Sequence, residues 1–169
     1  RGHDVKGAEM TAVLLTRLGY NTSFVQRVAW LVHQNMRFHY YVGVVEANPK
    51  KWMRKEARSG LFRKASDLAA AMVQLSEVCA GDIMGSGKPY AQTDSTLEFG
   101  HCMADLTQNM PIHTRDLKYD ARLIQLAEKQ VGPMLKYLLE GVQNGRIDNE
   151  PEALLVAVQG KLARQQRMG

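Results

Sequence analysis

Apolar residues recur along this chain at intervals of three and four positions, which is the spacing of one face of an α-helix. Val13, Leu14 and Leu18 share one face of an expected first helix, and Gly19 is well suited to end it. No segment shows the convincing alternation of apolar and polar residues that a half-buried strand requires. The pattern therefore predicts an all-α fold.

A second helix is expected to open at Ser23 and Gln26, which form a capping-box pattern. A short loop of Tyr, Val and Gly residues is expected to follow it. Asn48 is a good N-cap and Pro49 a good first helical residue, so a third helix should run from there toward Gly60. The inward face of the second helix is predicted to consist of Phe24, Val28, Leu31 and Val32.

A fourth helix is expected from Ser66 onward. The segment 81–93 is rich in Gly and Pro, which interrupt helices, and it predicts a long loop or a junction between subdomains. We therefore divide the chain into two domains, 1–93 and 94–169. The inward face of the fourth helix is predicted to contain Leu68, Met72 and Leu75.

Short helices are expected to fill the second domain. Ser95 and Glu98 have the spacing that opens the first of them. The last two are expected to begin at Pro133 and at Pro151, because Pro is favoured in the first helical turn. Asn149 is predicted to cap the final helix.

Composition is that of a globular protein. Of the 169 residues, 45% are hydrophobic and 23% charged, enough to bury one core or two small ones. No uninterrupted apolar segment approaches the ~20 residues that cross a bilayer, and no signal-peptide pattern opens the chain. We therefore expect a cytoplasmic location and no membrane partner. Cys79 and Cys102 lack the spacing of a zinc site, which favours two reduced thiols.

Positive charge is concentrated in one part of the chain. The formal net charge is +5, and residues 50–64 contain many basic side chains and a single acidic one, Glu56. Clustering of this kind is the electrostatic footprint of a protein that binds a polyanion. The alternative is a basic helix that only faces solvent.

Aromatic residues accompany these charges in the segment 37–41 and at Trp52. Rings beside cations suit the stacking of bases from single-stranded RNA. In the alternative, Trp52 and Met53 pack inward while the tyrosines cover the core. For the aromatic residues we favour this second interpretation.

Two motifs that suggest nucleotide chemistry are incomplete. The sequence Gly-Ser-Gly-Lys at 85–88 resembles a phosphate-binding loop, but Asp82 stands where the first Gly is required and Pro89 where a hydroxyl is required. A nucleotidyl-transfer centre needs paired carboxylates to hold its metal ions, and the chain contains no Asp-x-Asp pair. We therefore expect no catalytic residues in this chain.

Four segments, covering about a quarter of the chain, resemble the C-terminal region of the bacterial tRNA nucleotidyltransferase and poly(A) polymerase family. Segments 1–10 and 30–39 are similar to its metal-binding HD-type domain, the first because His3 precedes a Gly-Ala pair and an apolar helix. Segments 132–139 and 144–155 are similar to its RNA-binding tail, with a helix opened by Gly-Pro and then an Asn-capped helix.

The resemblance implies that 1–93 is an HD-like helical bundle without its N-terminal part, and that 94–169 is a small helical RNA-binding tail. This region would hold an RNA, expected to be a tRNA, while a catalytic head upstream adds CCA or A to the 3′ end. Mg²⁺ and a nucleoside triphosphate would belong to that head, so this region alone would catalyse nothing. The residues expected to contact RNA are Arg37, Lys50, Lys51, Arg54, Lys55, Arg58, Arg63 and Lys64.

The resemblance also implies a vestigial metal site. His3 and Asp82 match ligand positions of the HD-type domain, whose naming doublet would lie upstream. Asn35 stands where the family often has His, with His33 two residues before it, and Asn is a poor ligand for a transition metal. We therefore expect ordinary histidines rather than a working site. Two alternatives stay open: an HD-type metal-dependent phosphohydrolase and a plain helical interaction module.

Overall fold

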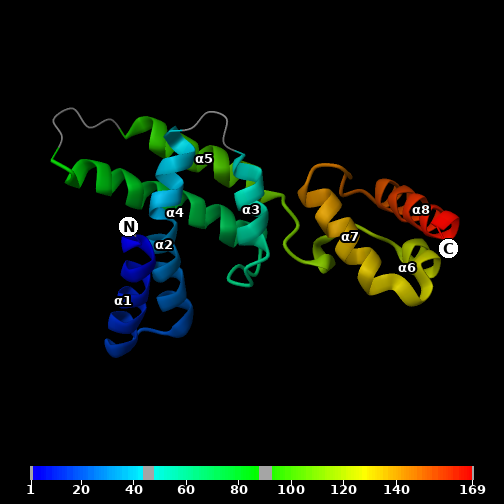
Figure 1. Cartoon of the computed structure of the whole chain (residues 1–169), viewed down its shortest axis with the longest axis horizontal. Coiled ribbons are helices and arrows are strands. Elements are labelled where there is room, and N and C mark those ends of the chain that lie inside the picture. The colour runs from blue at the N-terminus through cyan, green and yellow to red at the C-terminus, as the bar shows by residue number, and fades with distance from the viewer. Residues whose placement is uncertain (1, 44–47, 88–92, 169) are drawn as a thin grey trace. The chain divides into compact units, whose positions relative to one another are not determined.

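The computed structural model describes residues 2–43, 48–87 and 93–168, and every regular element in these ranges is a helix (Figure 1). The expectation of an all-α fold is confirmed. The chain separates into two compact units, Arg1–Asn109 and Met110–Gly169.

The first unit contains two pairs of neighbouring helices. α1 (His3–Arg17) packs along α2 (Thr22–Gly43), and α4 (Ala65–Gly85) packs along α5 (Asp94–Gln108). α2 also contacts α4, which joins the two pairs, and the short α3 (Pro49–Ala57) contacts α4 (Figure 1). Because α5 packs on α4, it belongs to this unit, and the boundary expected after residue 93 lies after Asn109.

Aromatic side chains dominate the core of the first unit. Trp30 meets Phe62 edge to face, with ring centroids 5.2 Å apart. Phe38 likewise meets Phe99 at 5.3 Å. Such pairs contribute beyond the area that they bury. Trp52 packs beside them, so the rings hold α2, α3, α5 and the segment before α4 together.

α2 does not bury the expected face most deeply, and Val28, Leu31 and Val32 are half-buried. Its buried residues are Val25, Trp30, Gln34 and Phe38, whereas Phe24 is 43% exposed. The cap also differs, because the Asn21 side chain accepts the backbone N–H of Phe24 and the hydroxyl of Ser23. α2 has apolar residues on two faces, and helical spacing alone did not decide which face meets the core.

Helix ends agree with the sequence where a local cap sets them. Asn48 caps α3 by accepting the backbone N–H of Lys51, as predicted. Two expected loops are partly helical, because α2 continues to Gly43 and α4 to Gly85. The rest of those loops, at 44–47 and 88–92, lies outside the described residues.

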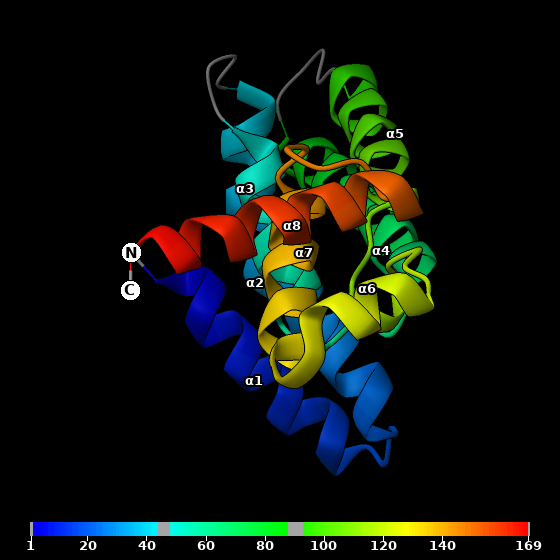
Figure 2. The ribbon, with the colours of Figure 1, turned by 90° about the vertical axis from the view of Figure 1, so that its right-hand side faces the viewer.

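The second unit is a small helical group around its own core. The 3₁₀ turn η1 (Thr114–Asp116) precedes α6 (Ala121–Ala127), and η2 (Glu128–Gln130) leads into α7 (Val131–Gln143). α8 (Pro151–Met168) packs on α6 and α7 and crosses α7 (Figure 2). The core consists of Leu117, Leu123, Ala127, Met134, Leu138, Leu154 and Val158.

Polar contacts fix the entry to α8. Asn149 does not cap that helix as predicted: its side-chain oxygen accepts the backbone N–H of Lys118, and its amide donates to the carbonyl of Asp116. Arg122 bridges Asp120 and Glu152 at 2.7 and 2.5 Å. Asn149 therefore connects two segments of the unit, and the spacing along the sequence does not show this.

Among the described residues, α4 is the one helix long and apolar enough to meet a length-and-composition test for a membrane span. Core helices of soluble proteins meet the same test, so this is weak evidence.

Leu68, Met72 and Leu75 of α4 are fully buried, as the sequence predicted.

The helices α4 and α5 approach each other closely at Gly100. A Cβ atom there would lie 2.2 Å from Ser76 Oγ and 2.3 Å from Ser76 Cβ. Only a residue without a side chain therefore fits at this contact between the helices.

We predict that Gly100→Ala lowers the free energy of unfolding of the first unit by about 1–3 kcal/mol, the usual cost of overpacking. Urea unfolding followed by tryptophan fluorescence measures this unit alone, because both tryptophans, Trp30 and Trp52, belong to it. Gly81→Ala is the control, since a Cβ there meets nothing within 4 Å. That variant should gain up to about 1 kcal/mol in helix propensity. An unchanged midpoint for Gly100→Ala would contradict the packing.

Candidate nucleic-acid interface

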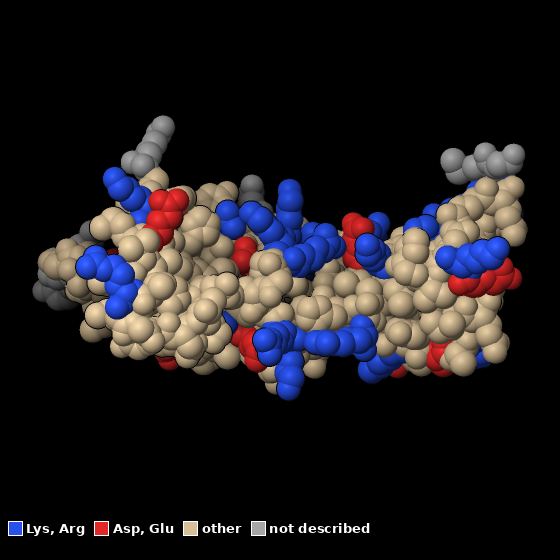
Figure 3. Space-filling model, turned by 90° about the horizontal axis from the view of Figure 1, so that it is seen from below, with Lys and Arg blue, Asp and Glu red and all other residues tan. Residues whose placement is uncertain are grey.

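The basic cluster lies on α3 and the segment that follows it. Trp52, Met53, Glu56 and Ala57 of α3 are buried, so its inward face carries the one acid of the 50–64 run. Lys50, Lys51 and Lys55 are exposed, and Arg54 is half-buried. Lys and Arg side chains extend into solvent and outnumber acidic ones on the face seen in Figure 3. The outward side of α3 therefore carries only positive charge.

Glu56 is the centre of a buried polar network between α3 and α2. Its carboxylate accepts the indole N–H of Trp30 at 2.7 Å and the side-chain amide of Gln34 at 3.3 Å. Gln34 in turn accepts the indole N–H of Trp52 at 3.2 Å. Buried polar groups are tolerated when they are satisfied in this way. The network fixes α3 on α2 with its basic side outward.

Arg37, expected to contact RNA, belongs to this network. Its Nη1 lies 3.6 Å from Glu56 Oε1 and donates to Gln34 Oε1 at 3.3 Å. The guanidinium supplies a counter-charge for a carboxylate that has little contact with solvent. Arg37 is thus tied to the core, unlike the lysines of α3.

The segment after α3 carries the rest of the cluster. Arg58, Arg63 and Lys64 are exposed. Gly60 has φ of 80°, a left-handed conformation that favours Gly and turns the chain toward α4. The Asp67 carboxylate accepts the backbone N–H of Lys64 at the start of α4 and holds the end of this segment.

The aromatic residues near the cluster mostly serve the core. Trp52 and Met53 are buried, as the favoured interpretation predicted. Tyr41 stacks on Trp52 with ring centroids 5.0 Å apart and an angle of 1° between the rings. Tyr40 is 57% exposed. Tyr40 meets Tyr41 edge to face with centroids 5.5 Å apart, so one exposed ring lies at the end of this series.

The three residues of the expected vestigial metal site lie on three helices, His3 on α1, His33 on α2 and Asp82 on α4. Within the part of the chain that the structure describes, no group of three or more His, Cys, Asp or Glu is placed to hold a metal ion. Asp82 Oδ2 lies 3.4 Å from His39 Nε2 instead. The Asn35 side chain lies 3.2 Å from the thiol of Cys79, which can donate to it.

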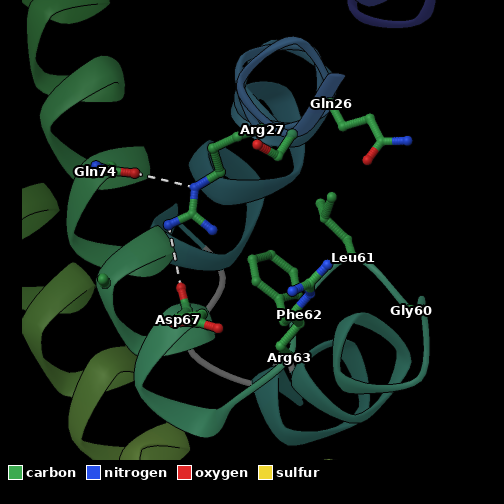
Figure 4. A pocket seen from close by; sticks show the side chains of 10 residues that line it. Gln26, Arg27, Gly60, Leu61, Phe62, Arg63, Asp67 and Gln74 are labelled. Carbon is green, nitrogen blue, oxygen red and sulfur yellow. Dashed lines mark hydrogen bonds between the residues drawn. The ribbon is translucent and has the colours of Figure 1, made fainter. Parts of the chain in front are cut away.

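A hollow of about 630 Å³ adjoins the basic segment between α2, α4 and residues 60–63 (Figure 4). Arg27 crosses it: Nε donates to Gln74 Oε1 and Nη2 to the backbone oxygen of Asp67, both at 3.1 Å. Burial lowers the pKa of the Arg27 guanidinium, and the charge of Asp67 opposes this shift. Arg63 also lines the hollow. Arg27 is a cation here that the basic run did not predict.

A second hollow, of about 500 Å³, shares Arg27 and Gln74 with the first. It is bordered by α2 and α4 and includes Phe24, Val28 and Leu31, which the sequence predicted to lie inward. The sequence does contain a signal for this surface. α2 has more apolar residues than a single core-facing stripe needs.

No family model, no curated protein and no solved structure matches the chain. The functional proposal therefore depends on the placement of charge and on the residues themselves.

We predict that Glu56→Leu lowers the free energy of unfolding of the first unit by about 3–5 kcal/mol, because it leaves buried donors and the Arg37 charge without their acceptor. Glu56→Gln should cost less, since it keeps one acceptor oxygen and the size of the side chain. Glu98→Leu, at an exposed position of α5, is the control and should change stability by less than about 0.5 kcal/mol. Equal urea midpoints for Glu56→Leu and this control would show that the network is not structural.

The two thiols should differ in reactivity. Burial, with a smaller contribution from Asp82, raises the pKa of Cys79 to about 12, so its thiol stays protonated at neutral pH. Cys102 is exposed. Because the thiolate is the reactive form, a thiol reagent at pH 8 should modify Cys102 quickly and Cys79 only after denaturation. Cys102→Ala should abolish the fast reaction, and fast modification of that variant would contradict the burial of Cys79.

Proposed function

We propose that this chain binds RNA through the outward side of α3 and the segment 58–64, and that it holds the RNA rather than reacting with it. The observation that carries the proposal is that the Glu56 side chain points into the core. The acid that would otherwise offset the neighbouring lysines faces Trp30 and Gln34, so the exposed positive charge is not neutralised within the run.

The resemblance to the tRNA nucleotidyltransferase and poly(A) polymerase family gives this binding a role. In that role the chain is the C-terminal, HD-like and tail region of an enzyme of the cytoplasm that adds CCA or A to RNA 3′ ends. A catalytic head would supply Mg²⁺, the nucleoside triphosphate and the paired carboxylates that this sequence lacks. The chain would contribute by positioning, which can lower a reaction barrier by several of the ~7–11 kcal/mol available from orienting reactants.

The chemistry of the surface favours phosphate contacts. Lys50, Lys51 and Lys55 are flexible point charges on one short helix, and they can follow a sugar-phosphate backbone without reading bases. Each contact releases condensed counterions, so the logarithm of the affinity should fall linearly with the logarithm of the salt concentration. We therefore expect binding to RNA of many sequences.

The double variant Lys51→Glu and Lys55→Glu tests this surface. We expect weaker binding to a tRNA and to unrelated RNA alike, because two phosphate contacts become repulsive. A plot of log affinity against log salt should become shallower by about one unit for each lysine–phosphate pair that the variant removes. Fluorescence anisotropy of labelled RNA over a range of salt concentrations gives both quantities.

The matched control is Lys6→Glu with Arg17→Glu, two exposed positions on α1 that bring the same change of charge outside the cluster. It should keep the wild-type salt slope, since only the net charge changes. An equal weakening in the two double variants would mean that net charge, not this surface, drives binding. Tryptophan fluorescence checks that both variants keep the fold of the first unit.

A further inference from the structure

We propose that the groove between α2 and α4 holds one unpaired nucleotide of the RNA, with its phosphate at Arg27 and Arg63 and its base against Phe24 and Val78. This inference rests on the proposed RNA binding and makes it specific for unpaired RNA. Arg27 and Gln74 line both hollows and hydrogen-bond to each other at 3.1 Å, so the two hollows adjoin at this pair. Their volumes, about 630 and 500 Å³, are of the size that holds small ligands.

The cationic end of the groove is preorganised. Gln74 and the Asp67 carbonyl hold two sides of the Arg27 guanidinium, whose central carbon lies 5.2 Å from the ring centroid of Phe62 (Figure 4). Neither of these two hydrogen bonds uses Nη1, and the guanidinium also lies 5.9 Å from the centroid of the Trp30 ring. A guanidinium fixed in this way loses little freedom when it binds a phosphate oxygen. Arg63 adds a second positive charge at the same end.

The other end of the groove is apolar and aromatic. Phe24 is 43% exposed and stacks on Tyr20 with ring centroids 4.8 Å apart and an angle of 22°. Val28, Leu31 and Val78 continue this surface. A nucleobase has a flat apolar face that stacks on exposed rings, and such stacking is tolerant of sequence. Phe24 is therefore an exposed ring within the groove on which a base can stack.

Two carboxylates line the groove, and both are compatible with a nucleotide. The Asp67 carboxylate lines the cationic end, where it accepts the backbone N–H of Lys64, and Arg27 and Arg63 outnumber it there. Glu77 lies at the apolar end, where an acceptor suits the N–H groups on the edge of a base. The phosphate end thus has two cations and one carboxylate, and the apolar end has Glu77 beside the proposed base.

An unpaired nucleotide fits better than an apolar peptide because Arg63 belongs to both the groove and the basic segment. Between the lysines of α3 and Arg63, the segment exposes no acidic side chain. An RNA backbone that follows these lysines can therefore reach the groove at Arg63. A base inside a duplex is stacked on its neighbours and has no free face, so paired RNA would contact the basic segment alone.

The test compares a short single-stranded RNA with a duplex of the same strand, both titrated against the full chain. Phe24→Ala should weaken binding of the single strand about tenfold, the effect of removing one stacking partner, and leave the duplex unchanged. Val78→Glu should do the same, because it replaces an apolar side chain under the face of the base with a charged one. Met84→Glu is its matched control, because Met84 is exposed on the same helix but does not line either hollow. It should bind both RNAs nearly as wild type does.

The outcomes separate this inference from the proposed function. If the wild-type chain binds neither RNA, both are wrong. If Lys51→Glu with Lys55→Glu weakens both RNAs while Phe24→Ala and Val78→Glu weaken neither, the groove assignment alone is wrong. An acidic amphipathic peptide that binds the wild-type chain but not Val78→Glu, while RNA binding is unaffected, would assign the groove to a protein partner. Far-ultraviolet circular dichroism confirms that each variant is folded.

Discussion

The buried carboxylate of Glu56 is the constraint on which the arrangement of the first unit depends. A carboxylate away from water needs donors and a counter-charge, and α2 supplies them from three successive turns through Trp30, Gln34 and Arg37. Satisfying this one group sets the rotation of α3 about its axis. The lysines of α3 then face outward, because they occupy the opposite side of the same short helix. A requirement of the core thereby produces the surface proposed to meet RNA.

The same arrangement leaves α2 with a second apolar face. Trp30 and Phe38 serve the core, while Phe24, Val28 and Leu31 border the groove against α4. The groove and the basic segment meet at Arg63. In the proposal, the basic surface contacts RNA of any sequence and the groove takes an unpaired nucleotide, as loops, bulges and ends provide.

Features set by neighbouring residues could be predicted from the sequence, and features set by distant ones could not. The all-α fold, the Asn48 cap and the buried Leu68, Met72 and Leu75 followed from local spacing. Which face of α2 is buried, what Asn149 contacts and where the Glu56 side chain points all depend on residues far along the chain. A glutamate among lysines has the pattern of an exposed residue, and only its partners on α2 show otherwise. Arg27 could not be predicted for the same reason, since Gln74 and Asp67 fix it from α4.

The proposed RNA interface is tested most directly by mapping it residue by residue with backbone amide NMR. A single-stranded RNA titrated into the labelled chain at low salt should shift the amides of residues 50–64 and of the α2 residues around Phe24. Raised salt should reverse the shifts at 50–64, because those contacts are to phosphates. Shifts confined to other parts of the chain, or shifts at 50–64 that ignore salt, would contradict the proposed interface.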